Sequence, residues 1–247
     1  MRMICVLAAL LFLAAQARPV HADSFISSTC GQGYFNIPDA TTGGVPGVLS
    51  CPLVVAAPGT IGAGDAVTLS LLGLAHEASG DLVVTLTHFD ASGTTPYGSP
   101  QYVFYRIGKT SADPTDYGYS AQFGGSSGTG DNYSFNSGSA GDLWGAASSL
   151  GSADFIPGSA YWTTGPYSGD ATSFSSEFAG QPVAGSWLLE ISDNAAGPSD
   201  PSTEGSLLQW QLTVETTAVP EPGYGGMFAT ALAAIAAWRR FRTGASH

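Results

Sequence analysis

Basic residues are scarce in this 247-residue chain, which has 7 Lys and Arg against 19 Asp and Glu. Between positions 23 and 220 only Arg106 and Lys109 are basic, whereas 18 residues are acidic. Binding to nucleic acid or to anionic lipid needs Lys and Arg to neutralise phosphates. We therefore expect no nucleic-acid partner. The same negative charge favours solubility and could hold divalent cations.

Long apolar runs are also lacking, and the first short one lies at the N-terminus. Arg2 precedes an apolar stretch over 4–15, and Val20-His21-Ala22 then offers the small residues that signal peptidase needs. This three-part order is typical of a secretory signal peptide over 1–22, with a mature chain that begins at Asp23. The alternative is a buried N-terminal helix in a cytosolic domain.

Cysteine is nearly absent. Cys5 leaves with the signal peptide, so that Cys30 and Cys51 remain as a single pair. In an oxidising compartment such a pair is expected to form a disulfide. A metal site or a reactive thiol is the alternative, and neither the spacing nor the neighbouring residues favour it.

Helical periodicity is the next feature that the mature chain lacks. At most two helical turns are expected, over 143–150, whereas alternation of apolar and polar residues predicts strands at 67–71, 82–87, 187–192 and 208–215, with a further candidate at 102–107. We predict an all-β, antiparallel, jelly-roll-like β-sandwich over 23–217. Its shared core is expected to contain Leu82, Val84, Leu86, Trp187, Leu189, Ile191, Leu208, Trp210 and Leu212.

The segment at about 111–169 is rich in Gly, Ser, Asp and aromatic residues and is expected to be a long insertion on the surface. Its aromatic residues could form a platform for sugar rings or could cover a small core of the insertion's own. These residues are Tyr117, Tyr119, Tyr133, Trp144, Tyr161, Trp162 and Tyr167.

Two stretches, 59–94 and 178–215, resemble the P domain (P/Homo B domain) of proprotein convertases. The resemblance is carried by His76, Asp81-Leu82, Gly93-Thr94, Gly185-x-Trp187-x-Leu189, Asp193, Gly205 and Trp210. It implies a jelly-roll sandwich that stabilises or docks a protease in that family. The residues upstream are too few for a subtilisin-type fold, so we expect no protease domain, and the long insertion departs from the family pattern.

Catalytic constellations are weak. The segment 124–128 fits G-x-S-x-G around Ser126, but it lies in Gly/Ser-rich sequence and the only later histidine is His247. His88 lies near Asp90 without a serine to complete a triad, and His76 is expected to pack or hydrogen-bond in a turn. We therefore expect a non-catalytic protein.

Oxygen-rich loops suit one cofactor, calcium, and no other cofactor is expected. The predicted ligands are Asp193, Asn194, Asp200 and Glu204, and Asp113 and Asp116 form a second acidic loop. The alternative is that these side chains are simply solvated.

The C-terminus, 218–247, has three parts. Val219-Pro220-Glu221-Pro222 precedes an apolar segment over 223–238, and the basic tail 239–247 contains Arg239, Arg240 and Arg242. This order resembles the PEP-CTERM sorting signal. It implies recognition and cleavage by an exosortase-type membrane protease in Gram-negative bacteria that make exopolysaccharide.

The physical properties of the tail agree with a transient membrane segment. Its apolar part is shorter than the ~20 residues of a comfortable helical span, and arginines on its C-terminal side would remain cytoplasmic. The protein would pass through the inner membrane to the cell surface or extracellular matrix. A permanent transmembrane anchor is the alternative.

Three functions remain open at this stage. The first is an exported structural or adhesive protein with exopolysaccharide as a possible partner. The second is a carbohydrate-binding module, and the third is an accessory of a secreted serine endopeptidase.

Overall fold

Eleven strands and one short α-helix make up the described part of the computed structural model, which covers residues 20–26, 34–125, 129–195 and 205–217. Val20–Thr217 forms one compact unit. Its strands are β1 (Val20–Ile26), β2 (Phe35–Ile37), β3 (Gly47–Val55), β4 (Val67–Leu74), β5 (Leu82–Phe89), β6 (Gln101–Tyr105), β7 (Asp131–Phe135), β8 (Ala160–Tyr161), β9 (Gly185–Asp193), β10 (Gly205–Leu207) and β11 (Gln209–Thr217). The helices are α2 (Leu143–Leu150) and a 3₁₀ turn, η1 (Phe174–Phe178).

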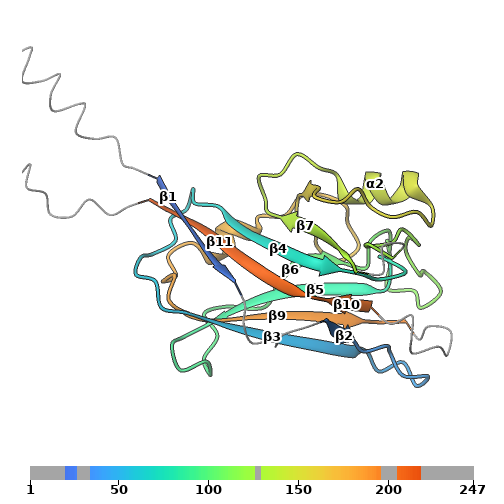
Figure 1. The fold of residues 1–247 in the computed structure, drawn as a ribbon, viewed down its shortest axis with the longest axis horizontal. Helices are drawn as coiled ribbons and strands as arrows, with labels where there is room; N and C mark the ends of the chain where they lie inside the picture. Colours follow the sequence, from blue (N-terminus) through green and yellow to red (C-terminus); the bar gives the residue numbers. More distant parts are fainter. Residues whose placement is uncertain (1–19, 27–33, 126–128, 196–204, 218–247) are drawn as a thin grey trace, which may run out of the picture. The chain divides into compact units, whose positions relative to one another are not determined.

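Two sheets face each other across the core, as predicted for a β-sandwich (Figure 1). One has the strand order β1-β11-β4-β7-β8 and the other β3-β9-β5-β6, while β10 and β2 form a small third sheet. β9 shows why the chain folds this way. Its nine residues alternate between buried and half-buried positions, so that one face of the strand is apolar.

The predicted core is confirmed except at Leu208. The other eight predicted residues are fully buried, whereas Leu208 is 39% exposed and its neighbour Leu207 is buried instead. Leu208 is the residue between β10, which pairs with β2, and β11, which pairs with β4. The change of partner interrupts the alternation there, so the strand begins one residue later than expected.

The segment 111–169 contributes more to the fold than a surface insertion would. β7 pairs with β4 inside the five-stranded sheet, and Phe123, Tyr133 and Phe155 pack together in the core. β8 runs parallel to β7. The sandwich was expected to be purely antiparallel, and this pair of strands departs from that prediction.

The helix α2 occupies the two turns that the sequence suggested. Asp142 caps its N-terminus, where the carboxylate accepts a hydrogen bond of 2.9 Å from the Gly145 amide. Gly151 ends the helix with φ +63°, a conformation that glycine adopts without steric cost. Leu143 and Ala147 face the core, one turn apart.

Residues 1–19 of the predicted signal segment and the apolar helix predicted over 223–238 lie outside the described residues, whereas residues 20–22 of the predicted signal peptide belong to β1. Within the residues that are described, no helix has the length and apolar character needed to cross a membrane.

Candidate functional site

A buried polar cluster lies where β9 ends and β5 begins. His76 Nε2 is 3.0 Å from Asp193 Oδ2, and both side chains are almost entirely buried. The other ring nitrogen of His76 contacts the backbone of Ala78. Asp193 Oδ1 accepts a hydrogen bond from the Ala195 amide at 3.0 Å. Both carboxylate oxygens of Asp193 are thus bonded within the protein.

Asp81 is the second carboxylate of this cluster. Burial, together with the negative charge of Asp193, raises its pKa to about 6. Arg106 offsets part of this effect, since its guanidinium lies 3.7 Å from Asp81 Oδ1 while its Nε donates to the Gly80 carbonyl. The backbone amide of Asn194 donates to the Asp81 carbonyl at 2.9 Å. The cluster therefore links the ends of β5 and β9.

The predicted calcium ligands fall partly within this cluster. Asp193 and Asn194 lie together, but the Asn194 side-chain amide donates to Ser192 and Asp81. Asp200 and Glu204 lie outside the described residues. In the described part of the chain, no three His, Cys, Asp or Glu side chains come together as a metal site. The calcium site stays a prediction.

The second acidic loop, which contains Asp113 and Asp116, is bonded to the ammonium group of Lys109. Lys109 is 3% exposed, and its ammonium donates to the carbonyl oxygens of Asp113 and Asp116, the latter at 2.6 Å. The Asp116 carboxylate accepts hydrogen bonds from the amides of Thr110 and Ser111. The carbonyl oxygens that could face a calcium ion are bonded to this ammonium.

The contacts of His88 differ from those of a catalytic base that is paired with Asp90. Its ring stacks on Trp187 at 3.9 Å, and Nδ1 is 2.8 Å from Gln181 Oε1. Burial lowers the pKa of His88. Asp90 instead caps its own turn by accepting from Ser92 at 2.6 Å. Ser126 of the G-x-S-x-G match lies outside the described residues.

The aromatic residues predicted as a sugar platform do not share one exposed surface. Tyr133 and Tyr161 are buried in the core, and Tyr119 and Trp144 pack against it. Trp162 is half-buried, with its indole N–H donating to the Gly169 carbonyl. Only Tyr117 (66% exposed) and Tyr167 (39%) of this set are exposed large side chains. Most of the set therefore forms core.

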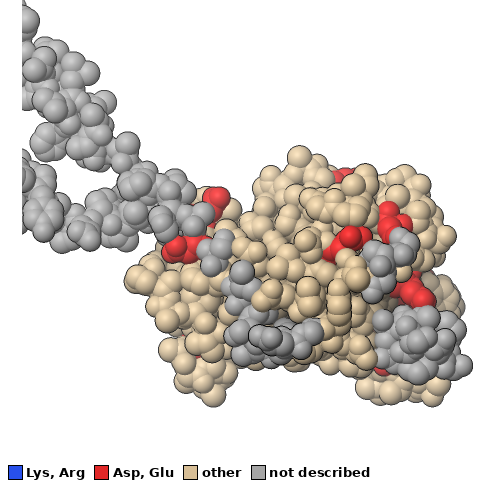
Figure 2. All heavy atoms as spheres, in the orientation of Figure 1, with Lys and Arg blue, Asp and Glu red and all other residues tan. Residues whose placement is uncertain are grey.

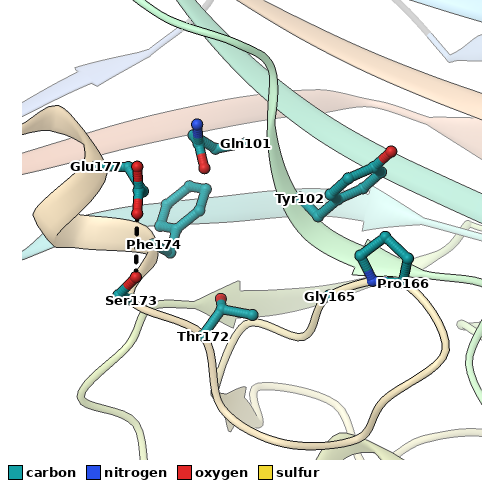
Figure 3. Close-up of a pocket in the computed structure, with 8 residues that line it drawn as sticks. All are labelled: Gln101, Tyr102, Gly165, Pro166, Thr172, Ser173, Phe174 and Glu177. Atoms are coloured by element: carbon teal, nitrogen blue, oxygen red, sulfur yellow. Dashed lines mark hydrogen bonds between the residues drawn. The ribbon is translucent and has the colours of Figure 1, made fainter.

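A cavity of about 240 Å³ lies where β6 meets η1 and the turns that precede it. In Figure 3 the rings of Tyr102 and Pro166 lie on one side, and Ser173 and Glu177 lie on the other. Gln101 and Phe174 also line it. The sequence analysis did not predict this site, because β6 and residues 165–177 are distant in the chain. The aromatic and proline residues of the two segments are the local features that point to it.

Negative charge predominates in the described residues, whose Lys and Arg side chains are Lys109 and Arg106. Figure 2 shows one face of the molecule, on which acidic side chains are scattered and the described residues show no Lys or Arg. Arg106 and Lys109 are both bonded inside the fold.

The remaining predicted residues are placed only in part. Cys51 is fully buried in β3, but Cys30 lies outside the described residues. The same holds for Val219, Pro220, Glu221, Pro222, Arg239, Arg240 and Arg242. The disulfide and the sorting motif therefore stay predictions.

No protein-family model matches the chain, and no curated protein matches it. Among solved structures it is similar to a serine protease of Aeromonas sobria, with a TM-score of 0.35 and 16% identity over 83% of this chain and 29% of that one. It is also similar to the A. sobria serine protease solved with its chaperone (TM-score 0.35, 14% identity, 85% and 29% covered). The chain spans less than a third of these structures, and so distant a likeness supports no argument about activity.

Proposed function

We propose that this is an exported, non-catalytic β-sandwich protein that an exosortase-type protease sorts to the cell surface or the exopolysaccharide matrix. One observation carries the proposal: Val219-Pro220-Glu221-Pro222, an apolar segment and three arginines follow each other in that order. β11, the last strand of the described residues, ends at Thr217, two positions before the motif begins at Val219. A protease could therefore cut at the motif without removing any residue of the sandwich.

A structural or adhesive role agrees with what the described residues do. His76, His88 and Lys109 bond to or pack against neighbouring protein groups. On the residues that resemble a P domain, we further propose a jelly-roll sandwich of that kind. Docking to a secreted serine endopeptidase is the second candidate, and it rests on that sequence resemblance.

The sorting proposal is tested by Glu221→Ala in the native host, with Thr243→Ala as a control in the same tail. We expect wild-type protein and the control to lose the tail and reach the cell surface or medium. The Glu221 variant should stay full length in the inner membrane. Its unfolding free energy should remain within about 0.5 kcal/mol of wild type, because the motif lies beyond the last strand.

Fractionation followed by mass spectrometry of both termini reads out this test. A wild-type protein that keeps its tail in the membrane, together with a Glu221 variant that behaves identically, would make the segment a plain anchor.

A further inference from the structure

We propose that the cavity beside Tyr102 binds one residue of a neutral polysaccharide. The proposal deepens the function proposed above. It relies on that function only for the location, the cell surface or exopolysaccharide matrix, where the protein would encounter such a polymer. The binding chemistry itself belongs to the described domain.

Tyr102 belongs to a row of three tyrosines whose rings support one another. The rings of Tyr102 and Tyr105 meet edge to face with centroids 5.6 Å apart, and those of Tyr105 and Tyr167 meet at 5.2 Å. The hydroxyls of Tyr105 and Tyr167 are 3.3 Å apart. Edge-to-face pairs favour defined ring orientations, so the Tyr102 ring is held in place before any ligand arrives.

The backbone beside the cavity is also in an unusual conformation. Tyr167 has φ +62°, a left-handed value that residues other than glycine seldom adopt and that recurs at ligand sites. It directly follows Pro166, whose ring lies beside Tyr102 in Figure 3. The two rings offer an apolar wall of the kind that packs against the C–H face of a sugar.

The opposite wall offers hydrogen-bond acceptors for sugar hydroxyls. Glu177 is exposed, and its Oε1 accepts from Ser173 at 3.1 Å, so Oε2 can accept from a ligand. The Gln101 amide nitrogen donates to the Ser99 carbonyl at 2.9 Å, which leaves the Gln101 side-chain oxygen as an acceptor. An apolar wall facing a few placed polar groups is the usual composition of a small-ligand site.

Size and charge select the ligand class. The volume of about 240 Å³ is below the roughly 300–1,000 Å³ of pockets for drug-sized ligands, which suits one sugar ring of a chain. Glu177 is the one charged residue that lines the cavity. A uronate or sulfated sugar would be repelled by it and by the net negative charge of residues 23–220, which include 18 acidic and 2 basic residues, whereas a neutral sugar would not.

Affinity electrophoresis tests the inference on protein purified from the native host, from whichever fraction contains it. The gels contain dextran, mannan, galactan or a β-glucan as neutral probes, and alginate or polygalacturonate as anionic ones. We expect at least one neutral polymer to retard the protein, with little change as salt rises, because no ion pair is formed. A failure of sorting changes the fraction used but leaves this result unaffected.

The variants separate this site from general surface effects. Tyr102→Ala should weaken the apparent association constant at least about tenfold, as expected for loss of an aromatic anchor. Tyr117→Ala, which removes an exposed tyrosine outside the cavity, should leave it unchanged. Tyr102→Ala also removes the ring contact with Tyr105, so it changes the local packing as well as the cavity. Glu177→Gln changes an exposed side chain and avoids this effect, and it should weaken binding several-fold.

Three results would overturn the proposal. One is that no neutral polymer retards the protein, and another is that only the anionic polymers do. The third is that the Tyr102 and Glu177 variants bind as tightly as wild type. The last of these would place any binding surface elsewhere.

Discussion

Single residues in the polar cluster set how the stability of the domain depends on pH. Asp81 has its pKa raised from 3.8 to about 6, first by burial and second by the charge of Asp193. The charges of His76 and Arg106 act in the opposite direction and only partly compensate. A raised pKa means that the folded state holds this proton more tightly than the unfolded state does.

The raised pKa of Asp81 fixes the direction in which stability changes with pH. The stabilising contribution of Asp81 is fully present below pH 3.8 and is lost as the pH rises through about 6. Asp81→Asn should therefore be more stable than wild type at pH 7, and the advantage should shrink toward pH 4. Urea unfolding at several pH values measures this difference.

Asp90→Asn provides a control of opposite sign. The Ser92 hydroxyl and neighbouring amides lower the pKa of Asp90, so this carboxylate stabilises the fold above its unfolded pKa and loses that effect in acid. The variant should be less stable than wild type at pH 7. Parallel pH profiles for both variants and wild type would contradict the assignment.

Trp210 is the largest fully buried side chain of β11. Its side chain is fully buried in the shared core. Trp210→Ala should lower the unfolding free energy by about 3–5 kcal/mol, because it leaves a large cavity. Val54→Ala, at a position that is 74% exposed, should change it by less than about 0.5 kcal/mol. Equal effects in denaturant unfolding would show that the indole contributes little.

At the scale of elements, the loop after β6 is organised by one buried ammonium. Lys109→Met would leave the Asp113 and Asp116 carbonyls without their donor. Hydrogen bonds to charged groups contribute about 1.5–3 kcal/mol each, so we expect a loss of at least that size. Amide exchange at Thr110 and Ser111 should also accelerate. Unchanged exchange would mean that Asp116 alone holds the loop.

The helix α2 depends on its cap in the same way. Asp142→Ala removes the acceptor for the Gly145 amide and should cost about 1 kcal/mol. Asp142→Asn should retain most of the stability, because asparagine is an equally good N-cap. Thermal unfolding of the two variants side by side measures the difference, and equal losses would argue against a capping role.

At the scale of the whole molecule, cleavage of the predicted signal peptide would shorten β1. This strand starts at Val20, so the predicted cleavage after Ala22 falls inside it. The pairs from Asp23↔Val214 to Ile26↔Gln211 would remain. We expect a mature N-terminus at Asp23 by mass spectrometry, with β1 still paired. A terminus at Val20 or earlier would show that the whole strand is retained.

The predicted disulfide also acts on the whole molecule, by shortening the loops of the unfolded chain. Closing the segment between Cys30 and Cys51 should add about 3 kcal/mol. Exported protein should therefore resist thiol reagents until it is reduced, and reduction should lower the melting temperature. Free thiols in protein from the periplasm would contradict the bridge.

The sequence by itself determined the strands at the centre of the sandwich. β4, β5, β9 and β11 were predicted because alternation with period two is local, and it states which side chains must be buried. The two turns of α2 over 143–150 were expected as well, and the structure shows that Asp142 and Gly151 bound them. These features need no knowledge of what lies across the core.

Only the tertiary structure decided which segments meet. β7 joins the main sheet through its pairing with β4, and the exposure of Leu208 follows from a change of partner between β10 and β11. The cavity combines Tyr102 with Pro166 and Glu177, which lie more than 60 positions further along the chain. Strand pairing and the approach of distant turns depend on packing of the whole domain, so no local pattern of residues contains them.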